Sequence, residues 1–192
     1  MEPITLTTER LRLRTFARTD AKAVFAACQD PDIQRWTLVP SPYLRSHAEG
    51  FVGHLVPNGW FNGTVFTFAV CLPDSGELVA STAVTRRGEM GTWEVGFWTA
   101  KEYRGRGYMT EAVRRLARWT FEELGAVRLE WRAEVGNEGS RAVAEKAGFA
   151  MEGTLRGALL RGAGARDAWI GSLLPTDLGL PGTYPYLPAD RA

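Results

Sequence analysis

Residues 92–135 read TWEVGFWTAKEYRGRGYMTEAVRRLARWTFEELGAVRLEWRAEV, a segment in which the apolar pattern changes twice. Residues 92–99 have the β-branched and aromatic composition of a strand, and residues 127–135 alternate between apolar and charged side chains, as a strand does. Between them, apolar residues recur at helical spacing over 113–124, and Gly125 is placed to end that helix. This order of strand, helix and strand predicts a crossover unit with parallel pairing.

The rest of the chain also alternates between strand-like and helix-like segments. Further strands are expected at residues 11–14, 64–72, 77–85, 149–160 and 167–174, with turns at 73–76 and 161–164. Helices are expected at 21–28, after an Asp20 N-cap and before Asp30-Pro31; at 46–55, where Ser46 and Glu49 have capping-box spacing; and at 140–147. Strands joined by short turns predict an antiparallel meander, so the fold class is mixed α/β (α+β).

The composition is 45% apolar, 11% aromatic and 23% charged over 192 residues, which is typical of one soluble globular domain. We expect that domain to span residues 1–192, with an irregular Pro/Gly-rich tail at 175–192. The composition excludes a disordered, collagen-like or membrane-spanning chain, and no apolar run approaches the length of a membrane helix. Cys28 and Cys71 are too few for a disulfide framework or a zinc site, so no metal is expected. Residues 1–4 show no signal-sequence pattern, so a cytoplasmic location is expected.

Charge is close to balanced over the whole chain, with 23 Lys and Arg against 22 Asp and Glu. No overall field would draw the protein to nucleic acid or to an anionic membrane, and neither partner is expected. Residues 101–118 are the exception, because they hold six basic residues and two acidic ones. This local excess of positive charge coincides with the loop that precedes the predicted helix.

The loop contains Gly105 and Gly107, which let the backbone turn tightly and approach a ligand. Free N–H groups at the start of the following helix form a natural anion site, so the segment predicts a phosphate cradle. A Walker loop is excluded because the chain lacks its Gly-Lys-Ser/Thr ending. A dinucleotide fingerprint fits badly because its third glycine would fall at Thr110.

The pattern Arg104-x-x-Gly107-x-Met109 resembles the Arg/Gln-x-x-Gly-x-Gly/Ala signature of the GNAT N-acetyltransferases, whose loop holds the pyrophosphate of acetyl-CoA. Met109 departs from the last position, and we expect its side chain to point away from the backbone contacts. Further segments between residues 5 and 178 resemble the RimJ/RimL branch of the family, in the family's order: Thr8 to Arg14, Glu94 to Trp98, Glu134 to Ser140, Glu145 to Phe149 and Glu152 to Arg156. The resemblance implies about seven mostly antiparallel strands, splayed in the middle of the sheet, and about four flanking helices.

Carried onto this chain, the resemblance implies that the sheet opens between the strands at 92–99 and 127–135 and admits the pantetheine arm of acetyl-CoA. The loop backbone would hold the pyrophosphate, and the side chains of Arg104 and Arg106 would screen its charge. Asn137 matches an asparagine that bonds the pantetheine side of the cofactor. The implied cofactor-binding residues are Phe97, Trp98, Thr99, Arg104, Gly105, Arg106, Gly107, Tyr108, Met109, Thr110 and Asn137.

Transfer of an acetyl group to an amine needs a base, a stabilised oxyanion and a proton for the leaving thiolate. A backbone N–H of the strand at 92–99 would serve the oxyanion. Glu94 is the candidate base, although a sheet residue paired with a nearby arginine has the same sequence pattern. The tyrosine that protonates the thiolate in many members is replaced by Ala144, and Ser140 matches the serine with this role in RimL-like members. Ser140 could instead be a helix N-cap, or serve both roles.

The resemblance therefore implies an acetyl-CoA-dependent N-acetyltransferase that acts on a protein N-terminus or a small-molecule amine in a ternary complex, without a metal. Two alternatives stay open: a catalytically idle acyl-CoA sensor, and a transferase of a larger acyl group such as succinyl. The acceptor site is expected within residues 30–62, with Trp36 and Trp60 as candidate pocket residues. The resemblance also suggests a homodimer formed through the late strands or the tail.

Overall fold

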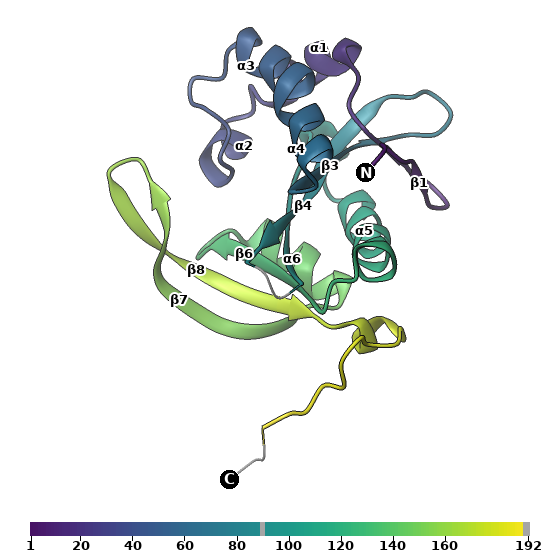
Figure 1. Cartoon of the computed structure of the whole chain (residues 1–192). Helices are drawn as coiled ribbons and strands as arrows, with labels where there is room; N and C mark the ends of the chain where they lie inside the picture. The colour runs from purple at the N-terminus through teal and green to yellow at the C-terminus, as the bar shows by residue number, and fades with distance from the viewer. Residues whose placement is uncertain (89–90, 190–192) are drawn as a thin grey trace.

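A single mixed sheet organises the computed structural model, which describes residues 1–88 and 91–189 (Figure 1). The strand order is β1-β2-β3-β4-β5-β6-β8-β7. The strands are β1 (Leu6–Thr7), β2 (Arg12–Arg14), β3 (Val65–Cys71), β4 (Leu78–Arg87), β5 (Thr92–Thr99), β6 (Arg128–Glu134), β7 (Ala150–Arg161) and β8 (Gly164–Leu173). Neighbours in the described sheet are antiparallel except β5 and β6, whose parallel pairing confirms the predicted crossover. The strand beyond the expected seven is β1, which at two residues is too short to show a periodicity.

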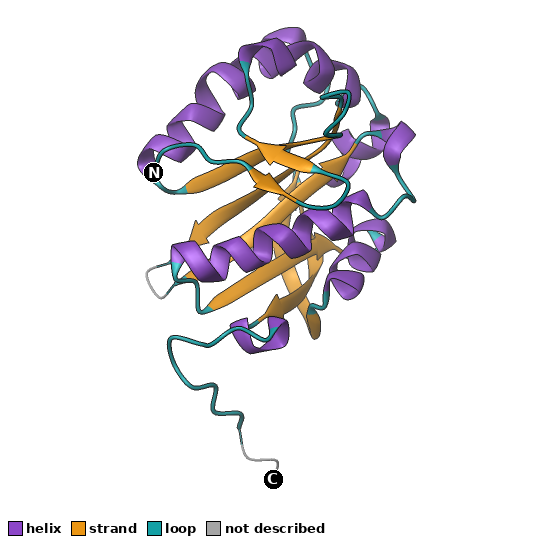
Figure 2. Ribbon diagram, turned by 90° about the vertical axis from the view of Figure 1, so that its right-hand side faces the viewer, coloured by secondary structure: helices purple, strands orange, loops and turns teal. Residues whose placement is uncertain are grey.

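The helices cover both faces of the sheet. They are α1 (Ala21–Ala27), α2 (Pro31–Trp36), α3 (Arg45–Gly50), α4 (Val56–Asn62), α5 (Tyr108–Leu124) and α6 (Glu138–Ala147), with a π turn at Phe51–Leu55 and 3₁₀ turns at Arg18–Asp20, Lys101–Tyr103 and Pro175–Leu178. The long helix α5 lies across one face (Figure 2), and α2 and α3 lie on the other side of the sheet (Figure 1). The β7–β8 hairpin curves away from α5 toward the side of α2 (Figure 1).

The sheet opens between β5 and β6, as the resemblance implied. Parallel pairing joins residues 92–95 of β5 to residues 128–131 of β6 and then stops, although β5 continues to Thr99 and β6 to Glu134. The outer half of β5 is thus paired with β4, while the outer half of β6 is paired with β8. A gap follows in the middle of the sheet, and the two opened strand edges border it.

Two helix starts differ from the sequence prediction. Helix α1 begins after Asp20, but the Asp20 carboxylate does not cap it and instead accepts the Ala17 N–H at 2.8 Å. Helix α3 begins one residue before Ser46, and Nδ1 of His47 accepts the N–H of Leu44 at 3.1 Å. A histidine ring nitrogen thus does the capping that the Ser46 spacing predicted, so that prediction was wrong.

A third difference is the helix α2, which the sequence did not predict. Asp30-Pro31 ends the preceding helix as expected, but it also begins a new one. Oδ1 of Asp30 accepts the N–H of Asp32 at 3.0 Å, and Pro31 occupies the first helical position, where its missing N–H costs nothing. The same dipeptide therefore separates α1 from α2, and α2 becomes part of the wall beside the gap.

The core between the sheet and the helices α4 and α5 is aromatic. Trp60 of α4 and Trp119 of α5 both pack edge-on against Phe66 of β3, with ring centroids 4.9 and 5.4 Å away.

Beyond the last 3₁₀ turn the tail is irregular to residue 189, as expected, and residues 190–192 lie outside the described part. None of the described helices is long and apolar enough to cross a membrane. Within residues 1–88 and 91–189, no group of three or more His, Cys, Asp or Glu side chains could hold a metal ion.

Candidate active site

The gap between β5 and β6 exposes backbone hydrogen-bonding groups of β5. In an antiparallel pair, alternate residues direct their N–H and C=O to the same neighbour. Because the Ala100 N–H bonds the Val79 carbonyl at 3.0 Å, Trp98 also directs its backbone toward β4. Phe97 and Thr99 therefore direct theirs toward the gap. An extended ligand with amide groups could continue the sheet along this edge.

At the end of the gap, the loop before α5 presents an open helix N-terminus. Gly105 and Gly107 have φ angles of 75° and 78°, a left-handed conformation that favours glycine. Among the described residues no side chain caps α5, so the N–H groups of its first turn, Tyr108 to Thr110, are free to bind an anion. Met109 is buried at 4% exposure, so its side chain points into the core and leaves the backbone of the loop accessible.

The β1–β2 turn holds the first turn of α5 in place. Glu111 accepts hydrogen bonds from the hydroxyl of Thr8 at 2.6 Å, from the Arg10 backbone N–H at 3.1 Å and from Arg10 Nε at 2.7 Å. Burial raises the pKa of Glu111, but these hydrogen bonds outweigh it and the net pKa lies below the usual value. This contact was not predicted from the sequence, although the Thr8-Glu9-Arg10 segment that makes it is part of the family resemblance.

A basic hollow of about 670 Å³ continues outward from the loop along α5. It is lined by Thr8, Glu9, Arg10, Gly107, Thr110, Glu111, Arg114, Arg115, Arg118 and Lys146. Arg114 also donates to the carbonyl of Lys146, which joins α5 to the end of α6. The positive charge seen in the sequence at 101–118 is thus partly collected in a concave surface beside the anion site.

The two side chains predicted to screen the phosphate, Arg104 and Arg106, both contact other protein groups. Arg104 donates to the carboxylates of Asp30 and Asp32, the latter at 3.1 Å, and its Nε donates to the carbonyl of Thr99 at 3.2 Å. Arg106 lies over the ring of Tyr103, at 5.3 Å from its centroid. Arg104 thus connects the loop to the start of α2 through ion pairs, and its role in screening the pyrophosphate stays a prediction.

Across the gap, Asn137 and Ser140 occupy the start of α6. Oδ1 of Asn137 accepts the N–H of Ser140 at 3.2 Å, so Asn137 is the N-cap and the reading of Ser140 as the cap was wrong. The hydroxyl oxygen of Ser140 accepts a hydrogen bond from Nε1 of Trp131 at 2.9 Å. The hydroxyl is thus held by β6 at the first turn of α6.

Glu94 lies on the part of β5 that is paired on both sides. Its carboxylate accepts hydrogen bonds from Arg87 at 3.1 and 3.2 Å and lies 3.6 Å from Nε of Arg132. Arg132 also bonds Glu130, at 2.7 Å, so charges alternate across neighbouring strands. The ion-paired arrangement is present, and the assignment of Glu94 as a base stays a prediction.

The two tryptophans expected in the acceptor pocket are separated by the fold. Trp60 is 2% exposed and its indole donates to the Thr67 carbonyl at 3.1 Å, so it packs the core instead of lining a pocket. Trp36 ends α2 and is half-buried, with the Arg35 guanidinium 4.2 Å from its ring centroid and Gly136 close by. Trp36 therefore lies at the β6 side of the gap, and its place in an acceptor pocket stays a prediction.

Comparison with known proteins gives consistent results. The sequence model described as an acetyltransferase (GNAT) domain matches residues 10–150. The protein named "Putative ribosomal N-acetyltransferase YdaF" from Bacillus subtilis is 50% identical over 66 residues, 34% of this chain and 36% of that one. The alignment thus spans about a third of that relative's length. "Uncharacterized N-acetyltransferase p20" from Bacillus licheniformis is 26% identical over 79% of this chain and 85% of its own. The structure of Mycobacterium smegmatis RimJ in complex with CoA-disulfide has a TM-score of 0.79, 22% identity, and covers 93% of this chain and 92% of RimJ.

Proposed function

The chain belongs to the GNAT acetyltransferase family, and from this premise we propose that it transfers an acetyl group from acetyl-CoA to a primary amine by direct attack within a ternary complex. One observation carries the proposal. An opened sheet edge and an uncapped helix N-terminus lie at the two ends of one short loop, residues 100–107, so that an amide-rich chain ending in a pyrophosphate fits both. The CoA ligand in the RimJ structure and the relatives' acetyltransferase names support the same cosubstrate.

The residues present fit coenzyme A. The N–H groups of Tyr108, Met109 and Thr110 would hold the pyrophosphate, and the backbone of Phe97 and Thr99 would bond the pantetheine amides. The basic hollow beside Gly107 would accept the remaining phosphate-bearing part of the nucleotide. When bound, acetyl-CoA supplies an activated thioester with a thiolate leaving group.

Two protein side chains would then transfer protons, one from the acceptor and one to the leaving group. A C–N bond forms as the neutral amine attacks, the C–S bond breaks as the thiolate leaves, and the new amide nitrogen loses one proton, which would replace the proton that Ser140 gives to sulfur. Glu94 would take the proton of the acceptor ammonium through water, since Arg87 occupies its carboxylate directly. An indole N–H can only donate, so Trp131 leaves the Ser140 proton free, and Ser140 would give it to the departing sulfur.

Peptide amines are the first acceptors to test, because YdaF is named a putative ribosomal N-acetyltransferase. The test combines acetyl-CoA binding by thermal shift with thiol release over a panel of peptide and small-molecule amines. We expect acetyl-CoA to raise the Tm and at least one amine to release thiol. Absence of both effects would refute the proposal. Binding without thiol release from any amine would instead support the idle sensor, and faster release from succinyl-CoA would support the larger acyl group.

A further inference from the structure

One buried carboxylate at the edge of the gap is surrounded by an excess of guanidinium groups. Glu134 ends β6 with its side chain 6% exposed, and Arg35 of α2 donates two hydrogen bonds to it, at 2.6 and 2.9 Å. Nε of Arg161, at the tip of the β7–β8 hairpin, lies 3.6 Å away. Arg166 completes the group: it lies on β8 two residues from Ala168, which pairs with Glu134, and therefore on the same face of the sheet.

These charges do not balance. A single carboxylate neutralises one of the three guanidinium groups, so two positive charges remain in this cluster of Arg35, Glu134, Arg161 and Arg166. The direction of the Glu134 pKa agrees, since hydrogen bonds from Arg35 and the charges of Arg161 and Arg166 lower it against the opposing effect of burial. The excess is also accessible, because the Arg35 side chain is 48% exposed and Arg166 is exposed.

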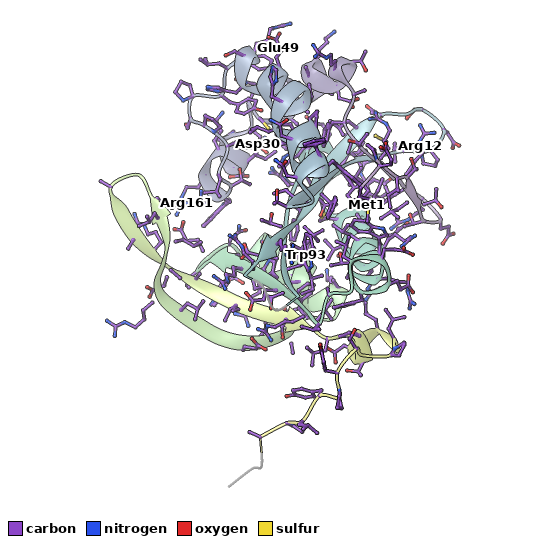
Figure 3. All side chains as sticks on the ribbon, in the orientation of Figure 1. Met1, Arg12, Asp30, Glu49, Trp93 and Arg161 are labelled. Carbon is purple, nitrogen blue, oxygen red and sulfur yellow. The ribbon has the colours of Figure 1, made fainter. Side chains whose placement is uncertain are left out.

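The cluster is fixed in position. Arg161 donates to the backbone carbonyls of Trp36, at 2.9 Å, and of Thr37, which fastens the hairpin tip to the end of α2. Figure 3 shows Arg161 on the hairpin side that faces α2. A guanidinium group already held by the backbone loses little side-chain entropy when it binds a further anion.

The location relates the cluster to the acceptor. Glu134 belongs to the half of β6 that borders the gap, on the face opposite Trp131 and Ser140, and Trp36 lies beside it. An amine that reaches the gap from this side would bring its neighbouring groups against the cluster. The proposed cofactor site lies at α5, on the other side of the gap, and leaves these guanidinium groups unused.

We propose that Arg35, Arg161 and Arg166 form a subsite for a carboxylate that the acceptor carries within a few bonds of its reactive amine. This inference rests on the proposed function and specifies its substrate class. The carboxylate could be an acidic side chain next to a peptide N-terminus or the α-carboxylate of a free amino acid. Polyamines and other polycationic acceptors are disfavoured by the same excess of positive charge.

Two matched acceptor pairs test the subsite. Ser-Glu-Gly-Gly is compared with Ser-Gln-Gly-Gly, and free serine with serine amide, both as substrates in the thiol-release assay and as ligands in calorimetry. In at least one pair we expect the carboxylate member to have kcat/KM and affinity about tenfold higher, as charge-assisted bonds predict. The pair that shows the preference identifies the source of the carboxylate.

The variant Arg166→Gln should reduce that preference to less than about threefold, chiefly by lowering kcat/KM for the carboxylate member. Arg156→Gln, an exposed residue of β7 outside the cluster, is the matched control and should keep the full preference. Equal use and equal binding of both members would overturn the subsite while leaving the acetyltransferase intact. Preferential binding of the carboxylate member without turnover would support the subsite and count against the proposed function. A preference that survives Arg166→Gln and Arg161→Gln would also overturn it.

Discussion

The hydroxyl oxygen of Ser140 accepts a hydrogen bond from the indole Nε1 of Trp131 at 2.9 Å, which joins the start of α6 to the centre of β6. Because the indole nitrogen can only donate, the Ser140 proton is directed to another acceptor. Ser140 lies in the first turn of α6, where the helix dipole favours negative charge. This pair of residues is suited to meet a leaving thiolate.

Ser140→Ala should therefore lower kcat about 100-fold, the lower end of the usual contribution of a positioned general acid, with the acetyl-CoA KM nearly unchanged. Steady-state kinetics with varied acetyl-CoA measures both constants. Ser140→Thr keeps the hydroxyl and is the matched control, which should retain most of kcat. An alanine variant with normal kcat would leave Ser140 as a structural residue.

Glu94→Gln removes the candidate base and keeps the shape of the side chain. We expect kcat to fall about 100-fold and the fall to be smaller at high pH, where more of the acceptor amine is already neutral. Arg87→Gln, which breaks the ion pair and leaves the carboxylate, should cost much less. Equal losses for the two variants would show that the ion pair, rather than proton transfer, is what Glu94 supplies.

Glu111 links the β1–β2 turn to α5, and its lowered pKa makes that link depend on pH. A carboxylate with a lowered pKa in the folded state stabilises the protein above the usual pKa of about 4.3, and this stability is lost as pH falls through the lowered value. The Tm of the wild type should therefore fall more steeply than that of Glu111→Gln between about pH 5 and pH 3.

The matched control for this pH dependence is Glu122→Gln, an exposed residue that pairs with Arg118 on the same helix. Its effect on the free energy of unfolding should stay below about 0.5 kcal/mol, as for other surface pairs. Parallel Tm curves for the wild type and Glu111→Gln would contradict a stabilising role of the Glu111 hydrogen bonds.

Trp60→Phe tests whether that residue belongs to the core. The substitution leaves the buried Thr67 carbonyl without its indole partner and leaves a space among the aromatic rings, so the free energy of unfolding should fall by about 2–4 kcal/mol. The acceptor KM should not change. Chemical denaturation and steady-state kinetics on one preparation separate these effects, and a raised acceptor KM with normal stability would return Trp60 to the pocket.

Much of the fold could be predicted because its signals are local. The parallel pairing of β5 with β6 was predictable from the order of periodicities, and the opening of the sheet between them was predictable from the family resemblance. The short elements β1 and α2 were missed, since two and six residues are too few to show a period. The hydrogen bond from the Leu44 N–H to His47 was not predicted, because N-cap propensities favour Ser46 and the sequence does not show where the histidine ring points.

The candidate site divides in the same way. Gly105 and Gly107 indicate left-handed turns before the start of α5 in the sequence itself, because few other residues adopt a positive φ angle. The ion-pair partner of each charged side chain depends on which distant segments the fold brings together. Arg104 bonds Asp30, 74 residues away, and Arg35 bonds Glu134, 99 residues away, and no local pattern distinguishes these pairs from solvated charges. The sequence by itself thus determined the strand order around the loop and the glycine turns that leave the start of α5 open, whereas tertiary packing decided which carboxylate or carbonyl each guanidinium group contacts.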